Sequence, residues 1–358
     1  MKIGRITPNF HERERPINIA IVAGGTGGHI FPAIAVAQAL EQKQHQVVWI
    51  GAEGGMETRL VPQHHFQLET IHIQNLRGKG FVRHMMMPFR LLRAILQARR
   101  ILKKHQVDLV LGFGGFVAGP GGLAAKLLGI PLIIHEQNAV AGMTNRYLAR
   151  FAKFILTGFP SVFEGYPNKI VTGNPVRADL LPLRDLQYQV HHPLHILVIG
   201  GSLGAEVFNR VVPEVMQNLP VECWLQTGQK HFDTVKAEHL KVTAFIDDMN
   251  AAYTWADLVI CRAGALTVAE LAIIGKPAIF VPYPHAVDDH QTKNALAADR
   301  AGGAVLLSQE DFNVENLKGL LQDLLHDSAR LQDMSEKMRA LGRVDATDQV
   351  VRITGLSF

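Results

Sequence analysis

The stretch NIAIVAGGTGGHIFPAIAVAQAL, residues 18–40, determines the fold class that we expect. It opens with six mainly apolar residues, as in a strand of a parallel sheet that is covered on both faces. Four glycines and a threonine follow, and the segment after them has apolar residues at helical spacing. A buried strand that turns directly into a helix is typical of a Rossmann-like α/β domain.

The turn itself, GGTGG at residues 24–28, fits neither of two common nucleotide-binding motifs. A P-loop needs a lysine, which this turn lacks. A dinucleotide fingerprint that began at Gly25 would need a glycine where Ile30 stands, and this disfavours a dehydrogenase. Two interpretations remain: a backbone cradle for a phosphate at the start of a helix, and a tight turn without a ligand.

The histidine that ends this turn, His29, also has two interpretations. An imidazole titrates near neutral pH, so a histidine beside an anion cradle can take a proton from an attacking hydroxyl. The alternative is a histidine that only packs near the first turn of the helix.

The same design occurs a second time. LHILVIGGSLGAEVFNRVVPEV, residues 194–215, again joins an apolar strand, a Gly-Gly pair, a small hydroxyl residue and a helix. We therefore expect an α/β protein with two Rossmann-like, doubly wound domains facing a cleft. The first domain is expected at 17–173 and the second at 174–335, with residues 1–16 as a flexible leader. Ligands bind to such sheets at the carboxyl ends of the strands.

The expected strands are short runs rich in Val, Ile and Leu. In the first domain they lie at 17–23, 46–51, 108–113, 131–136 and 153–158. In the second, after the strand that opens 194–215, they lie at 223–228, 243–246, 256–264, 277–283 and 303–308.

Three further segments carry polar or glycine-rich patterns. LGFGGFVAGPGGLAAKLLG (111–129) is a second glycine-rich turn, which predicts either another anion site or a close contact between helix and sheet. In VICRAGALTVAELAIIGKP (259–277) a helix begins near Ala265, so its first amides can face a diphosphate. Glu270, one turn further along, can accept hydrogen bonds from ribose hydroxyls, or it can be a solvated helix residue.

The third segment is PYPHAVDDHQTKNALAADRAGGAV (282–305), in which Asp288 or Asp289 is expected to cap a helix. The side-chain amide of Gln291 both donates and accepts, which suits the hydroxyls of a sugar.

Composition excludes several classes of protein. The chain of 358 residues is 47% hydrophobic and carries a net charge of +4, with no apolar run long enough to cross a bilayer. Cys223 and Cys261 stand alone in apolar stretches, so we expect buried thiols and a reducing compartment. No His or Cys spacing indicates a bound metal, and we expect no cofactor.

One segment, residues 77–106, is strongly basic. From Thr70 to Val107 there are nine Lys or Arg residues and no acidic residue. From Arg90 onward, basic residues share one helical face and apolar residues share another. FVRHMMMPF (81–89), interpreted as a loop before this helix, suits the headgroup region of an anionic membrane. Nucleic acid is the rival partner, but no nucleic-acid-binding motif is present.

Seven motifs in order resemble one known family: GGTGGHIFPAIAVA, GFGGFVAGPGG, HEQNAVAG, VTGNPVR, GGSLGA, RAGALTVAE and DDHQTKNA. They are similar to those of the MurG family of bacterial cell-wall glycosyltransferases, over nearly the whole chain from Asn18. The resemblance implies the two-domain glycosyltransferase B fold, with a final helix at about 336–358 that returns to the first domain.

It also implies the reaction. GlcNAc would move from UDP-GlcNAc, with inversion and without a metal, to the MurNAc C4 hydroxyl of undecaprenyl-diphospho-MurNAc-pentapeptide, converting lipid I to lipid II. The enzyme would work as a peripheral protein on the cytoplasmic face of the inner membrane, and a cell-wall synthesis complex is a possible partner. The tentative membrane patch is formed by Phe81, Arg83, Met86, Phe89 and Arg90.

The resemblance further assigns roles by motif. His29 would be the general base, Asn138 would lie near the sugar, Arg177 and Ser202 would reach the phosphates, and the backbone at Ile246 would read the uracil. The remaining residues that it assigns to the donor are Thr26, Gly27, Gly28, Ala265, Leu266, Thr267, Val268, Ala269, Glu270 and Gln291. It assigns Gly114 and Gly115 to the diphosphate of the acceptor.

Two alternatives stay open at this point. A UDP-GlcNAc 2-epimerase-like enzyme would share the architecture and the donor, but would not need the basic, apolar segment. A membrane adaptor that binds a UDP-sugar without chemistry would bind ligand and release no UDP.

Overall fold

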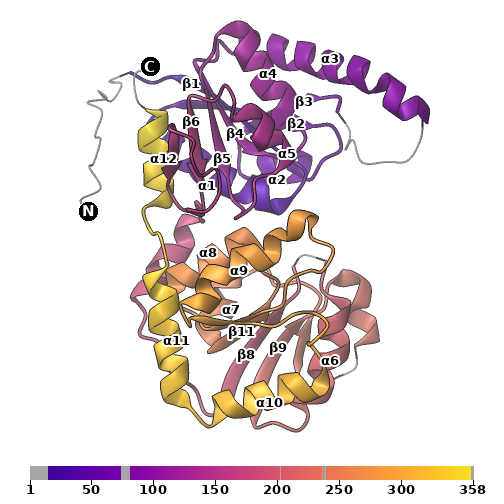
Figure 1. Ribbon diagram of the computed structural model, residues 1–358, viewed down its shortest axis with the longest axis vertical. Coiled ribbons are helices and arrows are strands. Elements are labelled where there is room, and N and C mark those ends of the chain that lie inside the picture. The colour runs from indigo at the N-terminus through magenta and orange to yellow at the C-terminus, as the bar shows by residue number, and fades with distance from the viewer. Residues whose placement is uncertain (1–14, 74–80, 202, 236, 238, 356–358) are drawn as a thin grey trace. The chain divides into compact units, whose positions relative to one another are not determined.

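The computed structural model describes residues 15–73, 81–201, 203–235, 237 and 239–355, and of residues 81–86 only the backbone. The chain divides into two compact units (Figure 1). Unit 1 consists of the described residues up to Gln137, Ala141–Pro175 and those from Asp345 onward. Unit 2 consists of Asn138–Val140 and Val176–Val344.

Unit 1 contains a seven-stranded sheet in the order β3-β2-β1-β4-β5-β6-β7, and every pair in it is parallel. All carboxyl ends of its strands therefore lie at one edge. The strands are β1 (Asn18–Ala23), β2 (Gln46–Ala52), β3 (Gln67–Ile71), β4 (Leu109–Gly114), β5 (Leu132–Glu136), β6 (Phe154–Thr157) and β7 (Lys169–Val171).

Both faces of this sheet are covered, which explains why its central strands are apolar throughout. Alternate residues of β1 serve two different cores: Ile19 and Ile21 pack with helix α1 (Gly27–Gln42), whereas Ala20 and Val22 pack with the helices of the other face. That other face carries α3 (Phe81–Lys104), α4 (Ala118–Leu128) and α5 (Met143–Leu148). The short helix α2 (Glu57–Gln63) follows β2.

Unit 2 contains a six-stranded sheet, also parallel throughout, in the order β10-β9-β8-β11-β12-β13. Its strands are β8 (Leu194–Ile199), β9 (Val221–Gln226), β10 (Lys241–Thr243), β11 (Leu258–Cys261), β12 (Ala278–Phe280) and β13 (Ala304–Leu306). Its helices are η1 (Ala178–Asp185), α6 (Glu206–Met216), η2 (Gln229–Thr234), α7 (Met249–Trp255), α8 (Ala265–Ile274), η3 (Val287–Asp289), α9 (His290–Arg300), α10 (Val314–Leu325) and α11 (Ser328–Ala340).

Two regions near the chain's connections add detail to the expected domains. The chain passes from unit 1 to unit 2 between Pro175 and Val176. In the region 336–358 the structure has the end of α11, in unit 2, and then α12 (Ala346–Thr354), in unit 1. Val350, Val351 and Ile353 of α12 are buried in the same core as α1.

The expectation of two doubly wound α/β domains is confirmed. Strands β3 and β7 were not predicted, because both are short and only partly buried, and their sequences lack a continuous apolar run. The interpretation of residues 81–89 as a loop is wrong, since α3 already begins at Phe81. Its Pro88 lies within the helix.

Both cysteines are buried and free, and burial raises the pKa of each thiol. Among the described residues, no helix is both long enough and apolar enough to cross a membrane.

Candidate functional site

Two glycine turns meet at the carboxyl edge of the first sheet, where the neighbouring strands β1 and β4 end. Gly115 has a φ of +78°, and a Cβ added there would lie 2.2 Å from the carbonyl oxygen of Gly24. Gly114 has a φ of +95°, and a Cβ there would lie 3.1 Å from the imidazole of His29. Only glycine allows this left-handed backbone and this approach together. The two glycine-rich turns singled out in the sequence therefore form one surface, with His29 against it.

The half-buried imidazole of His29 is held by a residue after β5, the next strand in the sheet. Its Nδ1 lies 3.0 Å from Oε1 of Gln137. The Gln137 amide is itself oriented, because its Nε2 lies 3.2 Å from the carbonyl oxygen of His135, and a carbonyl can only accept. Oε1 of Gln137 must therefore face His29 and accept a hydrogen bond from its Nδ1.

His135 completes this chain of hydrogen bonds. It is fully buried, and burial lowers its pKa to about 4, so it is neutral at pH 7. Its Nε2 lies 3.1 Å from the carbonyl oxygen of Gly173 and must donate, which leaves Nδ1 to accept from Nε2 of Gln137 at 3.1 Å. This chain of hydrogen bonds, from His135 through Gln137 to His29, selects the tautomer of neutral His29 that carries its hydrogen on Nδ1. In that tautomer Nε2 keeps its lone pair.

A buried carboxylate binds the backbone of the first glycine turn. Glu57, in the first turn of α2, is fully buried and accepts from the amides of Gly25 at 3.1 Å and Ala52 at 2.8 Å. A Cβ at Gly24 would lie 2.1 Å from its Oε1. The amide of Gly25 is therefore engaged, and the amides that remain for an anion are those at the start of α1, at Gly27 and Gly28. Thr26, the N-cap residue of α1, is exposed and makes no capping bond with its side chain.

The carboxyl edge of the second sheet carries the turn after β11. The sequence predicted a helix from Ala265, and α8 begins there, with Gly264 as its N-cap residue. The Glu270 carboxylate accepts from the hydroxyl of buried Tyr253 at 2.9 Å. Burial raises the pKa of this carboxyl, while the positive charge of Arg177 opposes the rise. Glu270 is therefore not a solvated helix residue.

Arg177 lies near this carboxylate but has other partners as well. Its Nη2 donates to Asn250 at 3.0 Å, and its Nε lies 3.6 Å from Asp179. The guanidinium is thus held beside Glu270 by a short polar network, close enough to act on its charge.

The other donor residues predicted from sequence are placed as follows. The Ile246 amide donates to Gln226 at 3.2 Å, and Oε1 of Gln291 accepts from the amide of Tyr283 at 2.9 Å. Oδ1 of Asn138, which belongs to unit 2, accepts from Asn294 at 3.3 Å. Ser202 lies outside the described residues.

The N-cap residue of α9 is Asp289, one of the two residues expected there. Its carboxylate accepts from the Thr292 hydroxyl at 2.7 Å rather than from a backbone amide.

Helix α3 has the two faces that the sequence predicted. Ala98 and Leu102 are buried against the sheet, whereas Arg90 and Arg93 are exposed. The exposed side also carries large apolar residues: Phe89 is 68% exposed, Leu92 55% and Leu96 44%. Of the tentative membrane patch, the structure describes the side chains of Phe89 and Arg90; those of Phe81, Arg83 and Met86 lie outside it.

Sequence reasoning missed Glu57, His135 and Gln137 as working parts of the site. The motif HEQNAVAG contains two of them and follows a strand, which was a usable signal. Glu57 gave no signal, because nothing around it in the sequence marks it as buried.

Models of a known protein family match both units of the chain. The model of the glycosyltransferase family 28 N-terminal domain matches residues 19–157, and that of the family's C-terminal domain matches residues 195–350. The chain belongs to glycosyltransferase family 28.

Within glycosyltransferase family 28 the chain has close relatives. It is 48% identical, over 94% of its length and 95% of the relative's, to the UDP-N-acetylglucosamine–N-acetylmuramyl-(pentapeptide) pyrophosphoryl-undecaprenol N-acetylglucosamine transferase of Shewanella loihica. The crystal structure of Acinetobacter baumannii MurG matches 94% of this chain and 99% of its own, with 42% identity and a TM-score of 0.81. A putative UDP-N-acetylglucosamine 2-epimerase of Listeria monocytogenes has a TM-score of 0.68 at 15% identity, which shows a shared fold alone.

The role of Glu57 can be tested by stability. We expect Glu57→Ala to lower the free energy of unfolding by about 2–4 kcal/mol, because it leaves one buried and one partly buried amide without an acceptor. The matched control is Glu53→Ala, whose carboxylate is exposed and contacts His72 alone among the described residues. Denaturant unfolding monitored by circular dichroism measures both; equal stabilities of the two variants would contradict the role given to Glu57.

Proposed function

We propose that this chain transfers GlcNAc from UDP-GlcNAc to the C4 hydroxyl of the MurNAc in undecaprenyl-diphospho-MurNAc-pentapeptide, with inversion at the sugar. The names of the family 28 relatives support this substrate pair. The observation that carries the mechanism is the oriented His29, whose Nε2 has a free lone pair at the edge of a glycine-lined surface.

In the proposed reaction the acceptor oxygen attacks C1 of GlcNAc, and the bond from C1 to the UDP oxygen breaks. The hydroxyl proton passes to Nε2 of His29, and UDP leaves with the electron pair. A single displacement of this kind inverts the configuration at C1. His29 would hold the proton until it exchanges with solvent.

The donor would be bound in unit 2 by groups at the carboxyl edge of its sheet. The first amides of α8, at Ala265, Leu266 and Thr267, lie at the N-terminus of a helix, whose dipole suits a diphosphate. The carboxylate of Glu270 suits the vicinal hydroxyls of a ribose. The proposed donor site also includes the other residues that the resemblance assigns to it: Asn138, Arg177, Ser202, Ile246, Val268, Ala269 and Gln291.

The acceptor diphosphate would be bound in unit 1. Since Glu57 occupies the Gly25 amide, the start of α1 and the turn at Gly114 and Gly115 provide the remaining backbone donors. This arrangement sets the anion beside His29, whose ring contacts Gly114.

We further propose that the enzyme acts as a peripheral protein at the cytoplasmic face of the inner membrane. The exposed side of α3 combines Phe89, Leu92 and Leu96 with exposed arginines, and it has no acidic residue. Apolar side chains at the headgroup boundary and basic side chains toward anionic lipids would both favour binding. A cell-wall synthesis complex at that surface stays a proposal.

The reaction can be tested directly by UDP release. We expect release from UDP-GlcNAc to depend on a short-chain lipid I analogue and to persist in EDTA. Release without the acceptor would instead indicate hydrolysis or an epimerase-like reaction, and tight binding without release would indicate an adaptor. A coupled assay for UDP measures all three.

The orientation of His29 gives a second, independent prediction. We expect His29→Ala to lower kcat by about 100- to 10,000-fold, because the base is lost. Gln137→Leu should lower kcat roughly tenfold with KM for UDP-GlcNAc unchanged, because His29 loses the acceptor that fixes its proton on Nδ1. Gln137→Glu, which keeps an acceptor, should recover part of the loss.

The control for these variants is Gln97→Leu, which removes an amide that accepts from the backbone of His72 instead. Steady-state kinetics with both substrates separates kcat from KM. Near-normal turnover by His29→Ala would show that His29 is not the base.

The membrane proposal rests on charge and can be tested by sedimentation with vesicles. Arg90→Glu and Arg93→Glu should each weaken binding to phosphatidylglycerol vesicles by about 1 kcal/mol or more, since each reverses an exposed charge on α3. Arg330→Glu, an exposed reversal on α11 of unit 2, is the control. Equal binding by all three variants and the parent chain would refute the assignment of α3.

A further inference from the structure

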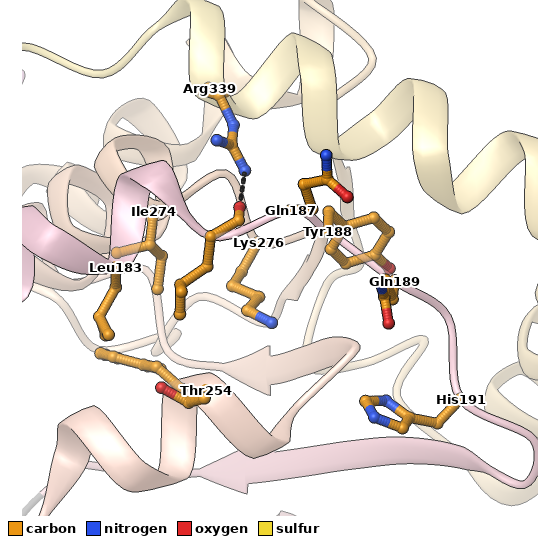
Figure 2. A pocket seen from close by; sticks show the side chains of 11 residues that line it. Leu183, Gln187, Tyr188, Gln189, His191, Thr254, Ile274, Lys276 and Arg339 are labelled. Carbon is orange, nitrogen blue, oxygen red and sulfur yellow. Dashed lines mark hydrogen bonds between the residues drawn. The ribbon is translucent and has the colours of Figure 1, made fainter.

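A pocket lies in unit 2 at the amino-terminal edge of its sheet, opposite the edge proposed for the donor (Figure 2). Its walls come from the segment before β8, the end of α7, the end of α8 and helix α11. Its volume is about 320 Å³, which is enough for a small metabolite. The lining residues are Leu183, Leu186, Gln187, Tyr188, Gln189, His191, Tyr253, Thr254, Ile274, Lys276 and Arg339.

The charge of this pocket is one-sided. Lys276 and Arg339 both line it, and none of the described residues that line it is acidic. The guanidinium of Arg339 is fixed by the carbonyl oxygens of Arg184 and Leu186. Lys276 extends its amino group into the space between Tyr188 and Thr254 (Figure 2), and its Nζ lies 5.5 Å from the centre of the Tyr188 ring.

The neighbours of the Lys276 ammonium offset the cost of its burial only in part. Its ammonium donates to the carbonyl oxygen of Ala256, and burial lowers its pKa to about 8. The charged groups around it are Asp257, which favours the ammonium, and Arg339, which opposes it. An anion in the pocket would therefore find a cation that gains from its charge.

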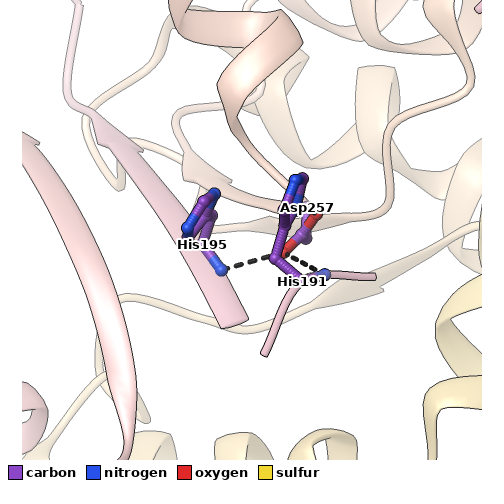
Figure 3. Close-up of side chains that lie close together, drawn as sticks. All are labelled: His191, His195 and Asp257. Carbon is purple, nitrogen blue, oxygen red and sulfur yellow. Dashed lines mark hydrogen bonds and ion pairs between the residues drawn. The ribbon is translucent and has the colours of Figure 1, made fainter. Parts of the chain in front are cut away.

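The wall beside the pocket is rigid. His191, His195 and Asp257 lie close together there (Figure 3), as a group that could be suspected of holding a metal ion. The Asp257 carboxylate, however, already accepts from the amides of His191 at 3.1 Å and His195 at 2.9 Å, and from Nδ1 of His191 at 2.7 Å. The two imidazoles are stacked, with centres 4.3 Å apart and planes 13° from parallel, so their nitrogen lone pairs do not converge on one point.

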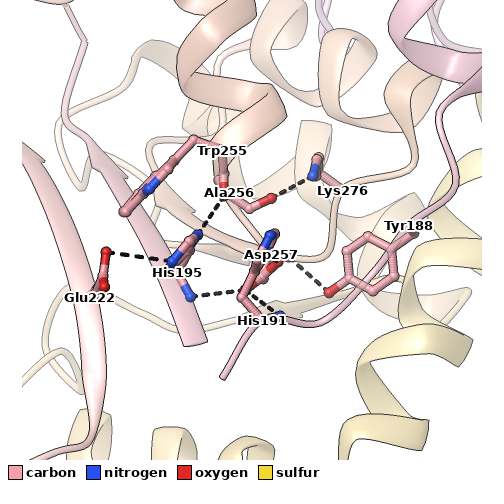
Figure 4. A network of polar contacts seen from close by, with 8 residues as sticks. All are labelled: Tyr188, His191, His195, Glu222, Trp255, Ala256, Asp257 and Lys276. Carbon is pink, nitrogen blue, oxygen red and sulfur yellow. Dashed lines mark hydrogen bonds and ion pairs between the residues drawn. The ribbon is translucent and has the colours of Figure 1, made fainter. Parts of the chain in front are cut away.

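Further hydrogen bonds extend this wall (Figure 4). The hydroxyl of Tyr188 donates to the carbonyl oxygen of Asp257 at 2.9 Å, and Nδ1 of His195 lies 3.1 Å from that of Trp255. The imidazole of His195 also stacks on the indole of Trp255, with centres 4.6 Å apart. The pocket is thus bounded by groups whose own hydrogen bonds hold them in place, and the Lys276 ammonium, with one of its three donors on Ala256, has donors left for a ligand.

Tyr253 connects the pocket to the opposite edge of the sheet. Its side chain lines the pocket, and its hydroxyl donates to the Glu270 carboxylate at 2.9 Å. Helix α8 makes the same connection, since Glu270 lies within it and Ile274, its last residue, lines the pocket. A ligand that moves Tyr253 would change the hydrogen bonding of Glu270.

We propose that this pocket is a second ligand site, which binds a small organic anion with an apolar body through Lys276, and that Tyr253 transmits its occupancy to Glu270. The apolar body would lie against Leu183, Ile274 and the ring of Tyr188, and the carboxylate or phosphate of the ligand would meet Lys276 and Arg339. The link to Glu270 rests on the proposed donor site; the pocket itself does not.

Binding is tested by isothermal titration calorimetry with benzoate, phenyl phosphate and, as the uncharged control, benzamide. We expect one of the anions to bind with a Kd of about 1 mM or below, and benzamide to bind at least tenfold more weakly. Lys276→Met should lose the binding at least tenfold, whereas Lys318→Met on α10, outside the pocket, should keep it.

Proton uptake gives a readout that a merely structural lysine would not change. At pH 8.5 Lys276 is largely neutral, so a bound anion should draw a proton onto it, measurable in buffers of different ionisation enthalpy. Binding should accordingly weaken from pH 7 to pH 9.5. Any of three results would overturn the site. They are equal binding of benzoate, phenyl phosphate and benzamide, equal binding to both lysine variants, and no binding of either anion at a concentration tenfold above the expected Kd.

The link to Glu270 is tested separately, by the effect of the bound probe on KM for UDP-GlcNAc. A shift of twofold or more is expected in the parent chain and none in Tyr253→Phe, which lacks the hydroxyl. An unchanged KM in the parent chain, or the same shift in both, would overturn the link. Because calorimetry does not use UDP-GlcNAc, its result stands even where the proposed function fails.

Discussion

The first unit depends on one backbone contact. The turn after β4 approaches the turn after β1 so closely that the α-carbon of Gly115 faces the Gly24 carbonyl with no room for a side chain. Parallel neighbouring strands bring the two turns to the same edge, and glycine at both lets them share a surface. His29 then falls against Gly114 and within reach of Gln137, so the geometry of the imidazole follows from the packing of bare backbone.

The buried polar groups at the same edge are satisfied by hydrogen bonds to backbone and amide groups. Glu57 is buried and binds backbone amides, and His135 is buried and neutral. Neutral His135 has one donor and one acceptor nitrogen: Nε2 faces the carbonyl oxygen of Gly173 and the hydroxyl of Thr172, and Nδ1 faces Nε2 of Gln137. A protonated ring would have to donate from both nitrogens, which would turn the Gln137 amide around and set its oxygen against the carbonyl of His135. The cost of burying charge on His135 therefore fixes the orientation of the Gln137 amide, whose oxygen faces Nδ1 of His29.

Much of this could be predicted from the sequence, and the limits have physical causes. The apolar strands, the two glycine turns and the start of α8 at Ala265 follow from local patterns, because period and turn chemistry act over a few residues. The contact between His29 and Gln137 joins residues 108 positions apart, and no local pattern encodes it. Residues 81–89 were interpreted as a loop, although they are helical and contain Pro88. The effect of a proline depends on its position in the helix, which the sequence around it does not give.

The second unit shows how one helix can serve both edges of a parallel sheet. Helix α8 starts beside the carboxyl edge and ends at the amino edge, where the chain continues into Lys276 and β12. Glu270 lies near its middle and bonds to Tyr253, which comes from α7 and reaches the opposite pocket. Burial has already raised the pKa of this carboxylate, and only the charge of Arg177 opposes the rise more strongly than the hydrogen bond from Tyr253, so the loss of that donor matters. A displacement of Tyr253 would therefore change the pKa of Glu270 more than the same displacement would change that of a solvated carboxylate. This pair can thus couple the two edges of the sheet.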